Sequence, residues 1–91
     1  MKFSIGLPTI TPSATKTLEQ HNIKPFDLLE RHSKGDWGDV CEDDKQSNET
    51  ALLKGYRLLS AYYIDATESE KVWIITEADR STTTILLPEE Y

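Results

Sequence analysis

The fold is decided by residues 56–88, which read YRLLSAYYIDATESEKVWIITEADRSTTTILLP. Residues 56–64 place aromatic and apolar side chains on both alternating faces, which predicts a central strand. After a polar loop, alternation over residues 72–77 predicts a second strand that forms a hairpin with the first. Residues 82–87 are rich in β-branched side chains and stop at Pro88, so they predict a third strand. Together the three segments predict an antiparallel meander.

The residues before this meander predict one further strand and a first helix. Residues 2–5 form a short mixed run that can pair as an N-terminal strand beside a sheet edge. Thr11 followed by Pro12 has the form of a helix N-cap with proline in the first turn, and apolar residues then recur four positions apart. We expect this helix to end near His21 or Asn22.

Two more helices are expected before the meander. Pro25 can open the second helix, and Gly35 is its expected stop. The acidic residues at 43 and 44 can cap a third helix, which has a thin apolar stripe and ends at Gly55. We therefore expect an α+β domain with an N-terminal β-strand, two to three short helices and a three-stranded antiparallel meander. The helices are expected to pack on one face of the sheet.

Large side chains on the predicted strands, and a tryptophan in the turn at residues 36–39, are expected to form the hydrophobic core. The expected core residues are Trp37, Leu58, Tyr62, Trp73, Ile75 and Leu86. A domain of this size has few large side chains, so both tryptophans are expected to pack into the main core.

The length and composition are typical of one small globular domain that spans residues 1–91. Hydrophobic residues make up 37% of the chain and charged residues 29%, which argues against a disordered or fibrous protein. The formal net charge is -6, so the field around the protein repels phosphate backbones, and no direct nucleic-acid binding is expected. The chain has a single cysteine and no apolar run of membrane-span or signal-peptide type. We expect a cytoplasmic protein without disulfides and without membrane association.

The turn between the second and third predicted strands is the first candidate for contact with a partner. It holds Glu77, Asp79, Arg80 and Ser81, and the C-terminal residues that end at Tyr91 are expected to lie nearby. Two carboxylates and a guanidinium on a rigid strand pair suit a charge-complementary contact. The structural alternative is that Asp79 caps the turn through its own backbone while Arg80 pairs with Glu77 or another carboxylate. For Arg80 taken alone, the sequence favours this structural alternative.

The other titratable side chains indicate no catalytic or metal-binding set. The acidic residues 36–44 lack the spacing of a calcium loop and suit the start of a helix. His21 and His32 lie on different predicted helices, without the spacing of metal ligands. Cys41 lies in an acidic segment, which disfavours its activation as a nucleophile. We therefore expect no catalytic residue, no metal and no cofactor.

Three stretches carry a resemblance to a known family: GDWG at residues 35–38, NETALLKGYRLLSAY at residues 48–62 and VWIITEADRSTTTILLPEEY at residues 72–91. On these stretches the chain resembles the small uncharacterised bacterial proteins called "plasmid-related protein", sometimes labelled type I restriction endonuclease subunit M. The resemblance implies an accessory protein of a mobile-element or restriction-associated locus, and it supplies no catalytic residue. A methyltransferase subunit needs a far larger cofactor-binding domain, and the chain has no glycine-rich strand-to-helix fingerprint.

Three functions are open on the sequence. The first is a small acidic, non-enzymatic module that binds another protein, because no coherent catalytic set is visible and the resemblance points the same way. The second is a RelE/ParE-like toxin, an RNase or gyrase inhibitor, because the order of predicted elements is similar, although the net charge of -6 argues against phosphate binding. The third is an acidic mimic of DNA that inhibits a defence enzyme, although such a charge is ordinary for a small protein. We expect a protein partner and at most a weak homodimer.

Overall fold

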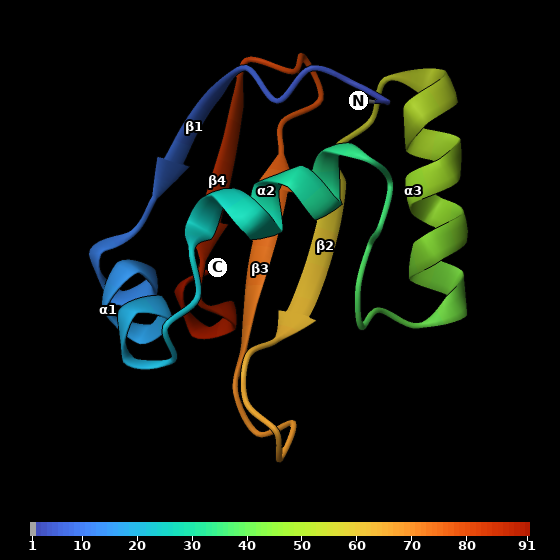
Figure 1. Cartoon of the computed structure of the whole chain (residues 1–91). Helices are drawn as coiled ribbons and strands as arrows, with labels where there is room; N and C mark the ends of the chain where they lie inside the picture. Colours follow the sequence, from blue (N-terminus) through green and yellow to red (C-terminus); the bar gives the residue numbers. More distant parts are fainter. Residues whose placement is uncertain (1) are drawn as a thin grey trace.

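The computed structural model describes residues 2–91 and has an α+β fold (Figure 1), which confirms the predicted class. The elements follow in the order β1 (Leu7–Ile10), α1 (Pro12–Gln20), α2 (Pro25–Ser33), α3 (Glu42–Lys54), β2 (Leu58–Tyr63), β3 (Lys71–Thr76), β4 (Thr82–Leu86) and the 3-10 helix η1 (Pro88–Glu90). Within residues 2–91, no helix combines the length and the apolar character needed to cross a lipid bilayer.

The four strands form one mixed sheet in the order β1-β4-β3-β2. Consecutive strands from β2 to β4 are antiparallel neighbours, which confirms the predicted meander. β1 lies parallel to β4, with Leu7 opposite Thr82 and Ile10 opposite Ile85. The three helices carry the chain from β1 at one edge of the sheet to β2 at the other (Figure 1).

The N-terminal strand begins later than the sequence indicated. β1 starts at Leu7, and the predicted strand residues 2–5 lie outside the sheet. Gly6 turns the chain with a φ of 61°, and a Cβ atom there would lie 2.3 Å from the carbonyl oxygen of Ser81. The Thr83 hydroxyl donates to the carbonyl of Ile5 at 2.7 Å, which holds the segment before this turn in place. Strand pairing starts only after a turn that requires glycine.

β2 is an edge strand and not the central strand that its pattern predicted. Its outer edge is nevertheless covered, because the Asn48 side chain donates to the carbonyl of Leu59 at 2.7 Å and accepts the N–H of Leu59 at 3.0 Å. Residues 37–39 bond both backbone groups of Ala61, with N···O distances of 3.1 and 2.6 Å. A strand covered in this way can carry apolar residues on both faces as a central strand does, which explains the wrong prediction.

The helix boundaries follow the predicted caps with one exception. Thr11 caps α1, because its hydroxyl oxygen accepts the N–H of Ala14 at 3.1 Å. Gly55 ends α3 in the left-handed conformation, with a φ of 75°. α3 begins at Glu42, so the acidic residues 43 and 44 lie in its first turn and do not cap it. Their charges still favour the positive end of the helix dipole.

The main core lies between the sheet and the helices α1 and α2, of which α2 crosses the front of the sheet in Figure 1. Its buried members are Ala14, Leu18, Leu28, Leu29, Tyr62, Ile64, Val72, Ile74 and Ile85. A second, smaller cluster joins α3 to β2 and contains Trp37, Ala51 and Leu58. Trp37 is therefore buried, but in this second cluster and not in the main core.

Trp73 lies outside the main core, contrary to the prediction. Alternation along β3 directs Ile74 toward the helices and Trp73 to the opposite face of the sheet. There the indole is only half-buried and meets the Tyr91 ring edge-on, with the ring centroids 5.7 Å apart. Ile75 and Leu86 share this face and are buried. Both faces of the sheet thus carry apolar groups, but α1 and α2 cover only the first, while α3 lies along the outer edge of β2.

Candidate interaction surface

Arg80 braces the turn between β3 and β4, the first candidate from the sequence. Its guanidinium donates to four backbone carbonyls at 2.7 to 3.2 Å, those of Tyr56, Glu77, Ala78 and Ala51. Ala51 lies in the last turns of α3, so the charge of Arg80 also complements the negative end of that helix. The prediction that Arg80 pairs with a carboxylate is wrong, because backbone carbonyls occupy its donors.

Asp79 and Ser81 complete the same turn. The Asp79 Oδ1 accepts the N–H of Ser81 at 2.9 Å. Hydrogen bonds from the hydroxyl and the N–H of Ser81 hold the pKa of Asp79 below its ordinary value. Both residues are exposed. Asp79 therefore caps the turn through a backbone N–H, as the sequence predicted in its structural alternative.

Arg57 brings Glu77 and Tyr91 together, although the sequence did not single this residue out. Its Nη1 donates to the Tyr91 hydroxyl at 2.7 Å, and its Nη2 lies 3.4 Å from Oε1 of Glu77. The only signal for this role is a basic residue at the start of an apolar strand that leads to an acidic turn. Because Tyr91 also contacts Trp73, the turn and the C-terminal residues form one continuous surface.

The sheet face that points away from α1 and α2 carries accessible aromatic groups. We call the surface formed by Leu59, Tyr63, Trp73 and Tyr91 the aromatic face. Leu59 and Trp73 are half-buried, whereas Tyr63 and Tyr91 are 37% and 69% exposed. The Lys71 ammonium lies 5.6 Å from the centroid of the Tyr63 ring, a cation–π distance. A rigid sheet thus holds large aromatic groups in contact with solvent, which is a mark of binding surfaces.

A cleft of about 150 Å³ opens beside the aromatic face, and we call it the Trp73 cleft. Its lining residues are Asp39, Val40, Cys41, Asp44, Leu59, Ala61, Lys71 and Trp73. Apolar side chains, two carboxylates, one ammonium and an exposed thiol therefore meet in one place. The Asp39 carboxylate is held in position, because its Oδ2 accepts the N–H of Tyr63 at 3.0 Å.

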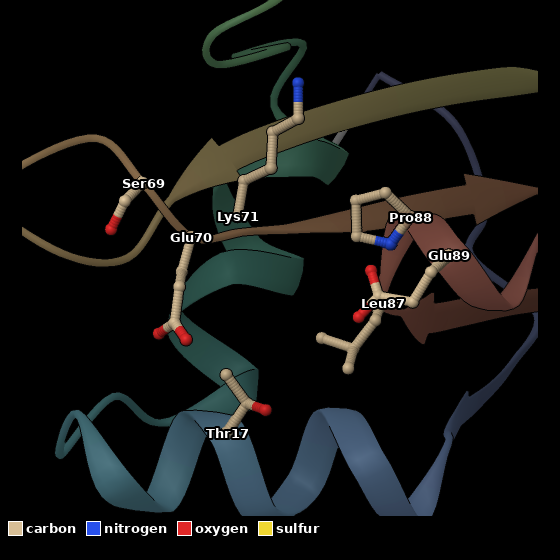
Figure 2. Close-up of a pocket in the computed structure, with 7 residues that line it drawn as sticks. All are labelled: Thr17, Ser69, Glu70, Lys71, Leu87, Pro88 and Glu89. Atoms are coloured by element: carbon tan, nitrogen blue, oxygen red, sulfur yellow. The ribbon is translucent and has the colours of Figure 1, made fainter.

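A larger hollow of about 300 Å³ lies where α1, the start of β3 and η1 meet (Figure 2). Its lining residues are Thr17, Ser69, Glu70, Lys71, Leu87, Pro88 and Glu89. Figure 2 shows the Glu70 carboxylate pointing toward Thr17, while the Lys71 side chain points away from it. Oε2 of Glu70 is already 2.7 Å from Nε2 of His21. The hollow therefore does not direct its opposite charges at a common point.

His32 of α2 is fully buried and bonded through both ring nitrogens. Its Nδ1 lies 2.5 Å from Oγ of Ser60, and its Nε2 lies 2.9 Å from Oγ1 of Thr76. The Thr76 hydroxyl lies 2.7 Å from that of Thr83, which in turn donates to the Ile5 carbonyl. One hydrogen-bonded network therefore ties α2, three strands and the N-terminal segment together.

The carbonyl at the end of this network determines every proton in it. The Ile5 oxygen can only accept, so Thr83 donates to it and Thr76 donates to Thr83. Thr76 must then accept the Nε2–H of His32, which leaves Nδ1 to accept the Ser60 hydroxyl. Burial lowers the pKa of His32 to about 4, so the ring is neutral. Ser60 and His32 are bonded like an activated nucleophile and its base, but both are 0% exposed and cannot touch a substrate.

The other candidate ligands lie apart. Among residues 2–91, no three His, Cys, Asp or Glu side chains are grouped as they would be around a metal ion. His21 bonds Glu70 at the surface and His32 lies in the core, while Cys41 is exposed at the start of α3.

Comparison of the chain with protein-family models, with curated proteins and with solved structures finds no match. The resemblance to the plasmid-related proteins stays a prediction.

Proposed function

We propose that the protein is a small non-enzymatic module that binds another protein on its aromatic face. The observation that carries the proposal is the half-buried indole of Trp73 on a face that no α-helix of the main core covers. Tryptophan and tyrosine on a rigid support supply much of the binding energy at protein interfaces. Tyr63 and Tyr91 extend the surface with rings that have a polar tip.

Neither edge of the sheet offers a full row of free backbone groups to an added strand, which favours docking on a face. At β2, Asn48 and residues 37–39 already occupy the outward backbone groups. At β1, every second residue directs its backbone groups toward β4, beginning with Leu7. The backbone groups of Pro8 and Ile10 therefore point away from the sheet, and proline has no N–H to donate. Docking through side chains is therefore favoured over extension of the sheet.

In this proposal the protein acts in the cytoplasm, as an accessory factor of the mobile-element or restriction-associated locus that the resemblance implies. Binding needs no cofactor, and the net charge of -6 disfavours contact with nucleic acid. The braced turn at Glu77–Ser81 borders the aromatic face through the link from Glu77 to Arg57 and Tyr91.

A selection of displayed random peptides on the immobilised protein tests the proposal. We expect peptides that bind the wild-type protein and lose about tenfold or more of their affinity for Trp73→Thr, which corresponds to roughly 1.4 kcal/mol. Threonine keeps the strand propensity, and Leu59→Thr provides a second variant of the same face. Leu53→Gln is the control, because Leu53 is 89% exposed on α3 and lies outside the aromatic face. A pool that tolerates both face variants, or no enriched pool, would contradict the proposal.

A further inference from the structure

We infer that the Trp73 cleft takes a cationic side chain, arginine or lysine, from a partner segment whose neighbouring side chains are apolar. This inference rests on the proposed function and adds the chemistry of the partner.

The lining of the Trp73 cleft has more acidic than basic residues. Asp39 and Asp44 supply two carboxylates, against the single ammonium of Lys71. Lys71 lies over the Tyr63 ring, and no ion pair among residues 2–91 takes up either carboxylate. Trp73 lines the same cleft, and indole rings attract cations through their quadrupole. Carboxylates and an aromatic ring at one place both favour a cation.

The Trp73 cleft is held in shape by hydrogen bonds within the domain. The N–H of Asp39 donates to the Ala61 carbonyl at 2.6 Å, and its carboxylate accepts the N–H of Tyr63 at 3.0 Å. Asp44 belongs to the first turn of α3, and Trp73 belongs to β3. These groups are already ordered, so binding a partner cation would cost little further conformational entropy. The volume of about 150 Å³ suits one inserted side chain and not a folded element.

Apolar side chains line and surround the Trp73 cleft. Leu59, Ala61 and Val40 contribute apolar lining, and Tyr63 and Tyr91 continue the apolar surface beyond it. A partner that offers only charge would leave this surface wet, whereas apolar residues beside the cation would cover it.

Other occupants fit less well. In a symmetric dimer, the same surface of both copies forms the interface. The two carboxylates of one copy would then lie opposite those of the other, and like charges would repel each other. The net charge of -6 on each copy adds to this repulsion. Nucleic acid would bring phosphates to the same carboxylates.

Two double variants of equal net charge separate a local effect from a general one. Asp39→Asn with Asp44→Asn neutralises the cleft, and the amide oxygen at position 39 can still accept the Tyr63 N–H. Asp27→Asn with Asp43→Asn is the matched control, because Asp27 lies in the first turn of α2 and Asp43 lines a separate hollow with Tyr56. Circular dichroism and thermal unfolding verify the fold of both proteins.

Peptides selected on the wild-type protein supply the probes. We expect them to share an arginine or lysine flanked by apolar residues. Replacing that arginine with citrulline, or the lysine with glutamine, should weaken binding about tenfold, and so should the cleft double variant. The two changes together should weaken it little further, because they remove the same contact. The control double variant should stay within about twofold of wild type.

Cys41 provides an independent measure of occupancy, because it is the only cysteine, is exposed and lines the cleft. A saturating peptide should slow its alkylation by iodoacetamide about tenfold in the wild-type protein. The same peptide concentration should protect Cys41 much less in the cleft double variant.

The other possible results of the peptide selection would contradict this inference, the proposed function or both. Peptides that depend on Trp73 but carry no cation, or that tolerate the loss of both carboxylates, would overturn this inference and leave the proposed function standing. A pool that binds Leu59→Thr less well but tolerates Trp73→Thr would overturn this inference alone, whereas a pool that tolerates both variants would overturn the proposed function as well. Self-association in sedimentation experiments that disappears in Trp73→Thr would assign the face to a second copy, and it would overturn the cationic partner.

Discussion

Mild acid should destabilise the fold through the buried imidazole of His32. Burial lowers the pKa of His32 from 6.5 to about 4 in the folded protein, whereas the unfolded chain restores the ordinary value. Between these two values the unfolded state binds one more proton than the folded state. The free energy of unfolding is therefore unaffected above this window and falls as the pH drops from about 6.5 toward 4.

The surroundings of the ring explain why protonation is unfavourable. A second proton must go to Nδ1, which already accepts the Ser60 hydroxyl. The rings of Phe3 and Trp37 pack against the imidazole, with centroids 5.1 and 5.8 Å from its own. The hydroxyls and aromatic rings in contact with His32 supply no negative charge to stabilise an imidazolium ion.

The linkage relation gives the size of the effect. With these pKa values, about 2 kcal/mol of the free energy of unfolding is lost at pH 5, and about 3 kcal/mol near pH 4. Hydrogen bonds lower the pKa values of Asp36, Asp65 and Asp79 in the folded protein. Each carboxylate therefore stabilises the fold at a pH above the pKa that it has in the unfolded chain, and loses this contribution as the pH falls below that value. This loss occurs at a lower pH than the loss caused by His32. Urea unfolding followed by tryptophan fluorescence between pH 7.5 and pH 5 therefore reports mainly on His32.

The variant His32→Gln should be less stable than wild type at neutral pH but nearly independent of pH across this interval. His21→Gln is the matched control, because it removes the only other histidine of the chain. Equal losses in wild type and His32→Gln between pH 7.5 and pH 5 would refute the reasoning, as would a loss abolished by His21→Gln alone. Nitrogen chemical shifts of the ring should also show Nε2 protonated and Nδ1 bare.

Three further changes test the contacts that hold the fold. Arg80→Ala should lower the free energy of unfolding by about 2 kcal/mol, because four carbonyls lose a charged donor. Arg80→Lys should restore less than half of this loss. An unchanged urea midpoint in Arg80→Ala would reject the bracing role. Gly38→Ala should lower the free energy of unfolding by about 3 kcal/mol or more, because its Cβ would lie 2.1 Å from a carbonyl oxygen of β2. Gly55→Ala should lower it by about 1 kcal/mol, because a Cβ at that position meets nothing within 4 Å. Asn48→Ala should cost about 2 to 3 kcal/mol because it leaves two backbone groups of β2 unpaired, and faster amide exchange along β2 should accompany the loss.

The elements that sequence reasoning predicted well are those specified by neighbouring residues. Thr11 and the proline after it mark the start of α1, and Gly55 marks the end of α3. The meander was predictable because alternation along each strand and short connections between strands are local properties. β1 was misplaced because Gly6 is a turn whose necessity comes from the backbone of residues 80 and 81, far away in the chain.

The parts that could not be predicted depend on pairs of residues distant in sequence. Asn48 reads as one polar residue on a thin helix stripe, yet it completes the edge of β2. Arg57 reads as a lone charge, yet it joins a turn to the C-terminal residues. Of the predicted contact residues, Glu77 and Tyr91 do come together, whereas Arg80 serves the turn itself. A pattern of residue types contains no information on which of these distant partners meet.

A few groups on the two sides of the sheet are placed as stability alone would not favour. Ser60, Thr76 and Thr83 of the sheet are buried together with His32 of α2, and these polar groups are tolerated because all of them are bonded. The opposite face leaves the indole of Trp73 half-exposed, although full burial of such a side chain contributes on the order of 3 kcal/mol. A domain of 91 residues has a small margin of stability. The partner contact that we propose at the aromatic face would supply the burial that Trp73 lacks within the domain itself.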